Sequence, residues 1–266
     1  MKNIPSMLVV LGAIIVSMSQ AATGFDSLGD IDNKIMGGDV VKSGEFPFLV
    51  SLAIDRPGEN NQCGGSIIDD RHIITAAHCV YGSTKVEAKL GCHEISKCKH
   101  SSKIDRQWIH HEYKVTRNLH FNDVAILRTK DSINFTDLIK PVSLPDRLED
   151  DYEIGESLTV AGWGKTHDDQ GVTDIARKVD VEVKTCPVPQ PLESHVCAGS
   201  PSKGGCVGDA GGPLFRTDKA SKRSTIVGIV STGPSCTGRG TGGQYTRVPH
   251  YLGWIESIKK ESQATV

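Results

Sequence analysis

The chain has 266 residues, of which 38% are hydrophobic and 23% charged, and its formal net charge is -2. A chain of this length can bury a substantial core, in one domain or in two closely joined halves. The lack of a basic excess excludes a typical nucleic-acid-binding protein, so we expect no nucleic-acid partner.

The N-terminus has the features of a signal peptide. Lys2 precedes an apolar run from Met7 to Val16, and Ser19 and Ala21 are small residues at the two positions that a signal peptidase reads. The run is shorter than the roughly 20 residues needed to cross a bilayer. We therefore expect residues 1–21 to be removed and the mature protein to be secreted and extracellular, without a membrane partner. The alternative is a buried helix at the start of the chain.

Short segments with β-strand composition begin at Phe46 and alternate with turn signals. The segments 48–54, 64–68, 72–75 and 225–231 are rich in apolar and β-branched residues. The polar segment 56–62 contains proline and glycine and is expected to be a turn region. This spacing favours an all-β barrel or sandwich. Near the C-terminus, Leu252, Ile255 and Ile258 lie at three-residue intervals, which predicts an amphipathic helix over residues 251–260.

Three motifs carry the chemistry of the chain. In order, they are Thr75-Ala76-Ala77-His78-Cys79, Asn122-Asp123-Val124-Ala125-Ile126-Leu127 and Gly208-Asp209-Ala210-Gly211-Gly212-Pro213. They resemble the histidine, aspartate and nucleophile segments of the chymotrypsin/trypsin family of serine proteases. Their order differs from that of α/β-hydrolases and subtilisins.

The resemblance extends from Ile35 to about Lys260 and implies an all-β fold: two packed six-stranded antiparallel Greek-key barrels with a C-terminal α-helix. The implied organisation is a signal peptide over residues 1–21, a pro-segment over 22–34 and a trypsin-like domain over 35–266. Within that domain, the first barrel covers about 35–145, the second about 146–250 and the terminal helix about 250–261.

The resemblance also implies roles for the motif residues. His78 is the expected general base, Asp123 the carboxylate that orients its imidazole, and Ser231 the residue that supports this carboxylate. The family has a serine nucleophile where this chain has Ala210. A methyl group cannot attack a carbonyl, although the backbone N–H groups of Gly208 and Ala210 can still form an oxyanion hole.

The segment Lys34-Ile35-Met36-Gly37-Gly38 resembles the activation site of the same family. The resemblance implies cleavage after Lys34 and insertion of the new Ile35 ammonium beside Asp209. A buried ion pair is expensive to desolvate, which suits a switch better than a source of stability. The alternative is an ordinary Lys-Ile pair in a linker.

The positions that line the substrate pocket in the family carry no charge here. They are Gly204, Thr232, Gly233 and Gly243. Gly204 stands where trypsin-like members have an aspartate, and Thr232 replaces a tryptophan that forms an apolar wall. The pocket is therefore expected to favour an apolar or aromatic side chain.

The eight cysteines fit a secreted protein with disulfides. The resemblance implies the pairs Cys63–Cys79 and Cys206–Cys236. Cys186–Cys197 is expected as a further bridge, and Cys92–Cys98 pairs by elimination. Cys92 occupies the position at which trypsins have a carboxylate that begins a calcium-binding loop. No two cysteines have the C-x-x-C spacing that is typical of zinc sites. We therefore expect no metal and no other cofactor. Asn134 begins a glycosylation sequon.

The leading functional hypothesis is a catalytically inactive serine protease homologue that acts by binding a protein. It would be a decoy, a cascade cofactor or an antagonist in a protease or immune pathway. One alternative is an active secreted serine endopeptidase whose serine is altered in this sequence. Another is a module that binds anionic polysaccharide through the basic residues Lys97, Lys99, His100, Lys103 and Arg106.

Overall fold

The computed structural model describes residues 38–116, 119–146, 152–166, 171–186, 193–200, 203–232 and 242–264. The expected signal peptide, the pro-segment and the Lys34–Ile35 bond lie outside the described residues. Among the described residues, no helix is both long and apolar enough to cross a lipid bilayer.

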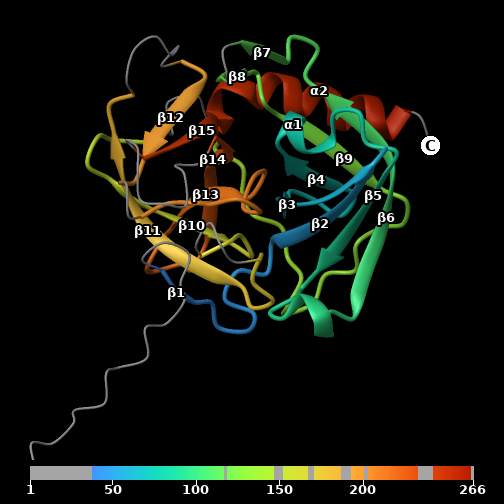
Figure 1. Ribbon diagram of the computed structural model, residues 1–266, viewed down its shortest axis with the longest axis horizontal. Coiled ribbons are helices and arrows are strands. Elements are labelled where there is room, and N and C mark those ends of the chain that lie inside the picture. The colour runs from blue at the N-terminus through green and yellow to red at the C-terminus, as the bar shows by residue number, and fades with distance from the viewer. Residues whose placement is uncertain are drawn as a thin grey trace, which may run out of the picture. The chain divides into compact units, whose positions relative to one another are not determined.

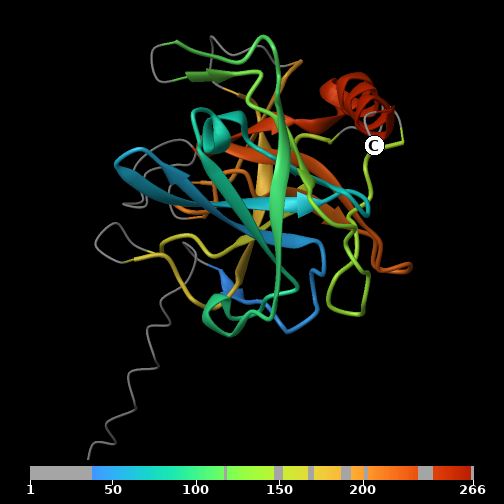
Figure 2. The same cartoon turned by 90° about the vertical axis from the view of Figure 1, so that its right-hand side faces the viewer.

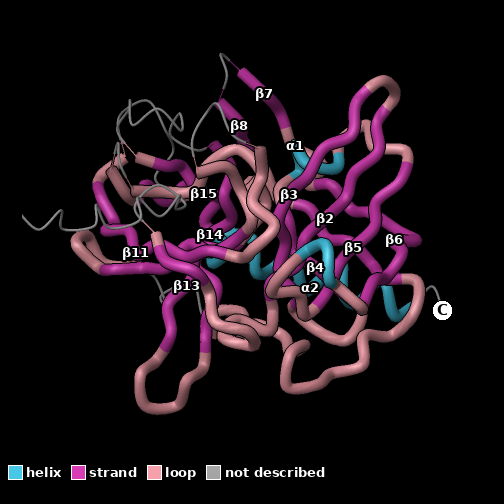
Figure 3. The backbone as a smooth tube through the Cα atoms, turned by 60° about the horizontal axis from the view of Figure 1, so that its bottom comes forward, coloured by secondary structure: helices cyan, strands magenta, loops and turns pink. Residues whose placement is uncertain are grey.

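The strands form two closed antiparallel barrels, seen side by side in Figure 1 and as two groups of magenta strands in Figure 3. The first has the order β2-β3-β4-β9-β6-β5. Its strands are β2 (Leu49–Arg56), β3 (Glu59–Ile67), β4 (His72–Thr75), β5 (Lys85–Leu90), β6 (His100–Ile109) and β9 (Ala125–Thr129).

The second barrel has the order β11-β10-β13-β14-β15-β12 and closes through a β11–β12 pairing. Its strands are β10 (Ser157–Gly162), β11 (Arg177–Lys184), β12 (His195–Ala198), β13 (Pro213–Thr217), β14 (Ser224–Thr232) and β15 (Gly243–Arg247). The alternation in β11 directs Val179, Val181 and Val183 into the interior and charged residues outward. The prediction of two six-stranded antiparallel barrels is confirmed.

Three short strands and four helices complete the described fold. In chain order they are β1 (Asp39–Val40), α1 (Ala77–Val80), η1 (Ile95–Lys97), the hairpin of β7 (Lys114–Thr116) and β8 (Leu119–Phe121), η2 (Val248–Tyr251) and α2 (Leu252–Ala264). Strand β1 pairs with β11, so this part of the chain lies on the second barrel before β2 starts the first.

The terminal helix α2 follows the last strand of the second barrel but packs against the first (Figure 2). Glu261 on α2 accepts a hydrogen bond from the Trp108 indole at 3.0 Å and pairs with Arg106 at 2.7 Å. Both partners lie on β6. The helix therefore ties the end of the chain to the opposite barrel.

The turn predicted over residues 56–62 is wrong in extent. Arg56 pairs with Glu59, so β2 and β3 are joined by a two-residue loop, Pro57-Gly58. Gly58 has a φ of 81°, which glycine adopts without strain. Residues Asn60 to Gln62 are polar but belong to β3, because cross-strand pairing with β2 outweighs their low β-propensity.

The loop closed by Cys92 and Cys98 joins the two barrels. The backbone N–H of Ala176 donates to the carbonyl of His93 at 2.9 Å, and the Trp163 indole donates to the same carbonyl at 3.2 Å. Ser96 donates its backbone N–H to the Asp174 carboxylate at 2.8 Å. The disulfide loop of the first barrel thus holds the segment that follows β10 in the second.

Three phenylalanine rings pack where the barrels meet. The ring centroid of Phe215 on β13 lies 4.8 Å from Phe46 and 5.1 Å from Phe48, both in edge-on geometry. Phe215 is fully buried. Edge-on aromatic contacts add to the free energy gained by burying the rings.

We expect Phe215→Ala to lower the free energy of unfolding by about 3–5 kcal/mol, because it removes a buried ring and leaves a cavity between the barrels. Phe135, with 47% of its surface exposed, provides the matched control. Phe135→Ala should change the same quantity by less than about 0.5 kcal/mol. Denaturant titration of both variants checks this, and equal effects would contradict the assigned role of Phe215.

Candidate active-site cleft

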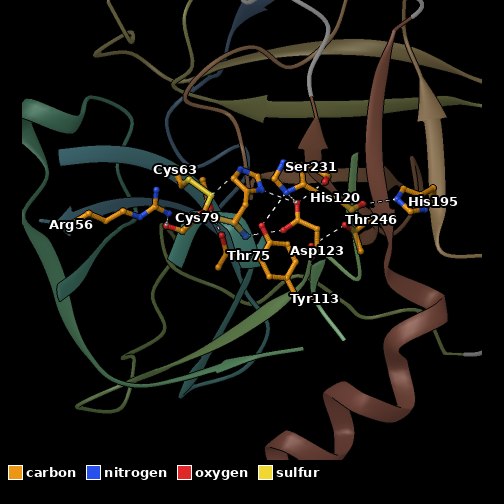
Figure 4. A network of polar contacts seen from close by, with 12 residues as sticks. Arg56, Cys63, Thr75, Cys79, Tyr113, His120, Asp123, His195, Ser231 and Thr246 are labelled. Carbon is orange, nitrogen blue, oxygen red and sulfur yellow. Dashed lines mark hydrogen bonds and ion pairs between the residues drawn. A yellow bond between two sulfur atoms is a disulfide. The ribbon is translucent and has the colours of Figure 1, made fainter. Parts of the chain in front are cut away.

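Strand pairing brings His78 and Asp123 together across 45 residues of sequence. His78 lies on α1, directly after β4, and Asp123 lies two residues before β9. Strands β4 and β9 are neighbours, with Thr75 opposite Ala125. The carboxylate of Asp123, which is labelled in Figure 4, accepts the backbone N–H of His78 at 2.8 Å and lies 2.7 Å from its Nδ1.

Asp123 is 1% exposed and receives donors from both barrels. Ser231 on β14 donates its hydroxyl to Oδ2 at 2.5 Å, and Thr246 on β15 donates to the Asp123 carbonyl at 2.9 Å. Burial by itself raises the pKa of Asp123, but the hydrogen bonds and charge of His78 and the Ser231 hydroxyl outweigh it and lower this pKa below its ordinary value. The carboxylate therefore stays ionised and acts as an acceptor.

The loop with Ala210 lies against β3 and β4 through contacts that only glycine allows. Gly64 donates its N–H to the Ala210 carbonyl at 2.7 Å. A Cβ on Gly64 would be 2.7 Å from the Gly212 Cα, and one on Gly211 would be 2.2 Å from the Thr75 hydroxyl. Gly211 also has a φ of 79°. The repeated glycines of the motif are thus explained by close approach of two backbones.

Two backbone N–H groups of this loop remain available. Among the described residues, neither Gly208 nor Ala210 donates its N–H to an acceptor. Gly208 has a φ of 98°, a conformation that favours glycine. Both residues line a cavity of about 390 Å³, together with His78 and Thr232. The cleft therefore offers a histidine, an alanine and two backbone donors within one hollow.

Asp209 points away from this cleft and is completely buried. Its carboxylate accepts the N–H of Gly164 at 2.7 Å and that of Cys206 at 2.9 Å. A Cβ at Gly162 or Gly164 would lie 2.3 Å from a carboxylate oxygen, which gives the Gly-Trp-Gly segment a steric reason. Burial raises the pKa of Asp209 to about 6, although the two N–H donors act to lower it.

Three of the four expected substrate-pocket positions are among the described residues. Gly204 and Gly243 are buried, and Thr232 lines the cleft. A Cβ on Gly243 would lie 2.9 Å from the Tyr245 hydroxyl, so the ring of Tyr245 occupies the space beside this glycine. Gly233 lies outside the described residues, as do Lys34 and Ile35.

The cleft also contains residues that the sequence analysis did not single out. His120 on β8 lies with its Nδ1 4.0 Å from Asp123 Oδ2, and its ring centroid is 4.9 Å from that of His78. The Tyr113 hydroxyl is 3.1 Å from His120 Nδ1. Arg56 at the end of β2 donates to the carbonyls of His78 and Cys79. The only sequence signal for His120 was its place three residues before Asp123.

The disulfides Cys63–Cys79, Cys92–Cys98 and Cys186–Cys197 are present as expected. Cys206 is also disulfide-bonded, and its expected partner Cys236 lies outside the described residues. The first bridge anchors the residue that follows His78 to β3. Asn134 is exposed on the surface, where a glycan could be attached.

Comparison with known proteins agrees with this architecture. The family model described as Trypsin matches residues 35–255. The chain is 30% identical to "Melanization protease 1" of Drosophila melanogaster, over 87% of this chain and 66% of that protein. It is 33% identical to "Phenoloxidase-activating factor 1" of Holotrichia diomphalia, over 84% and 69%, and 32% identical to "Phenoloxidase-activating factor 3", over 85% and 72%. The chain thus spans about two thirds of the length of these relatives, and it belongs to the trypsin family.

Proposed function

We propose that this chain is a secreted serine protease homologue that does not hydrolyse peptides and acts by binding another protein. The observation that carries the proposal is Ala210, which stands in the cleft beside His78 where the family has its nucleophile. Loss of a triad serine costs about 10⁶ in kcat, on the order of 8 kcal/mol of barrier. Binding and the oxyanion donors alone retain far too little activity for proteolysis.

The Ser231 hydroxyl is a poor replacement for the serine. The Ser231 hydroxyl donates to Asp123 at 2.5 Å and is therefore engaged behind the carboxylate. In the proposed assignment, His78 and Asp123 occupy the triad positions and Ser231 supports the carboxylate. The backbone N–H groups of Gly208 and Ala210 form the oxyanion hole, and no nucleophilic hydroxyl lies at position 210.

The names of the relatives suggest the kind of partner. One is named a melanization protease and two are named phenoloxidase-activating factors. We infer that the binding partner is a protein of a comparable protease cascade, towards which this chain acts as cofactor, decoy or antagonist. Its expected signal peptide and the three disulfides support an extracellular setting.

The polysaccharide alternative has less support. Two of the basic side chains on which it depends are paired with acids: Lys97 with Glu94 at 2.6 Å and Arg106 with Glu261 at 2.7 Å. Their charge is thus partly neutralised at the surface. A protein partner remains the better proposal.

Protein cleaved after Lys34 should neither react with a fluorophosphonate probe nor turn over a peptide-library substrate, because it has no nucleophilic hydroxyl at position 210. Mass spectrometry of the probe adduct and fluorescence of released product measure this. Reproducible turnover that is lost in His78→Ala would overturn the proposal.

Ala210→Ser should make the cleaved protein reactive towards the fluorophosphonate, since His78, Asp123 and Ser231 are already hydrogen-bonded and two N–H donors are free. The double variant with His78→Ala is the matched control and should lose the reaction. This result would show that the substitution at position 210 alone accounts for the missing reaction. An unreactive Ala210→Ser protein would contradict the assignment of this cleft as a protease scaffold.

The proposed activation switch predicts a pH effect on stability. In the uncleaved chain the pKa of Asp209 is raised from 3.8 to about 6, so the folded state binds this proton more tightly than the unfolded state. The stabilisation of the folded state by this proton is complete below pH 3.8 and is lost as the pH rises through about 6. The free energy of unfolding should fall by about 3 kcal/mol over this range, since each unit of pKa shift corresponds to 1.36 kcal/mol.

Asp209→Asn should abolish that loss in the uncleaved protein, as measured by denaturant titration between pH 4 and 8. In the unsubstituted protein, cleavage after Lys34 should remove the loss of stability at rising pH, because a paired Ile35 ammonium lowers the pKa of Asp209. Identical pH profiles before and after cleavage would refute the switch.

A further inference from the structure

Two histidines from different parts of the chain face each other across the cleft. His78 on α1 and His120 on β8 have ring centroids 4.9 Å apart, with planes inclined by 55°. Both line the cavity that contains Ala210, and their side chains are 23% and 22% exposed. We propose that this pair is a binding site for a transition-metal ion such as Zn²⁺ or Cu²⁺, with the Asp123 carboxylate behind it.

The hydrogen bonds of His78 leave one ring nitrogen available. Its Nδ1 lies 2.7 Å from Asp123 Oδ2, and a carboxylate acceptor requires the proton on Nδ1. Nε2 then carries a lone pair. Within the described residues its one polar neighbour is the disulfide sulfur of Cys79 at 3.8 Å, a weak partner. Ala210 has no hydroxyl that would donate to this nitrogen.

His120 has a similar environment. Its Nδ1 is 3.1 Å from the Tyr113 hydroxyl and 4.0 Å from Asp123 Oδ2. When Nδ1 donates its proton to the Tyr113 hydroxyl, Nε2 is unprotonated. The His120 carbonyl lies 3.0 Å from the buried ring of His195, which anchors the strand. Metal-bound histidines commonly donate their second ring N–H to a carboxylate or another oxygen in this way.

The spacing of the rings fits coordination to one ion. With a Zn–N bond of 2.0–2.1 Å, an imidazole centroid lies about 3.2 Å from the metal, so two rings at 90–110° have centroids about 4.5–5.2 Å apart. The observed 4.9 Å lies in this range.

The ligand chemistry selects the class of metal. Imidazole nitrogen suits zinc and copper rather than calcium or magnesium, which prefer oxygen ligands. Cys63 and Cys79 are close to His78, but they are joined in a disulfide and cannot act as thiolates. The remaining coordination positions face the cavity, where water or a carboxylate of a bound protein can occupy them. The site does not depend on the proposed function.

Titration of zinc chloride into the intact protein, in competition with a chromophoric chelator, tests the proposal. We expect one equivalent to bind. His120→Gln and His78→Gln should each weaken the binding at least tenfold, since each removes a ligand. Circular dichroism of the variants confirms that they are folded.

The chain offers a matched control in a second histidine pair. His110 and His111 stack with ring centroids 4.6 Å apart, and His111 is exposed. His111→Gln should leave zinc affinity unchanged within about twofold if the cleft pair is the site. Loss of binding in His111→Gln but not in His120→Gln would overturn the proposal, as would failure of the unsubstituted protein to bind zinc.

A measurement on the unsubstituted protein avoids any effect of substitution on folding. Zinc should shift or broaden the NMR ring resonances of two of the ten histidines, His78 and His120. Perturbation confined to other histidines would rule out this site.

Discussion

The buried carboxylate of Asp123 is the point at which the two barrels depend on each other. It is almost inaccessible to water, and an ionised carboxylate in that position is tolerated only when donors surround it. His78 supplies a backbone and a ring donor from the first barrel, while Ser231 supplies a hydroxyl from the second. Separation of the barrels would remove the Ser231 donor and expose the carboxylate to water. The same contacts that keep the barrels together therefore orient the cleft histidine.

A second buried acid, Asp209, organises the other side of the nucleophile loop. It accepts two backbone N–H groups but has no charged partner among the described residues. Burial therefore raises its pKa, although the two N–H donors act to lower it. The glycines at 162 and 164 leave just enough room for its carboxylate. The two acids thus have opposite environments: the pKa of Asp123 is lowered, whereas that of Asp209 is raised. This contrast is consistent with the proposal that Asp123 is a fixed support and Asp209 part of a switch.

The replacement of serine by alanine changes the chemistry of the cleft without disturbing its frame. Alanine keeps the backbone donor and the carbonyl that accepts from Gly64, so the loop retains its contacts. What is lost is the hydroxyl partner of His78. A histidine already oriented by a carboxylate, with its other nitrogen unoccupied, is well suited to hold a metal ion or a group of a bound protein. Under the proposed function, the remaining groups of this cleft serve binding.

Much of this molecule could be read from its sequence. The motifs around His78, Asp123 and Ala210 identify the family and hence the two barrels, and alternation in segments such as 177–184 directs apolar residues to one face. Elimination of the other cysteines also predicted that Cys92 and Cys98 pair with each other, and the structure contains this bridge. By contrast, the polar composition of residues 60–62 was misleading, because pairing with β2 decides that they are a strand.

Only the tertiary structure decided which distant residues meet. The approach of His120 to His78 depends on the β7–β8 hairpin, and the contact of the 92–98 loop with Asp174 depends on how the barrels pack. Neither has a periodic or motif signal, since contacts of this kind arise from strand register and barrel packing rather than from neighbouring residues. The sequence by itself determined the family, three of the disulfide pairs and the missing hydroxyl. The packing of the barrels determined what surrounds the position where that hydroxyl would be.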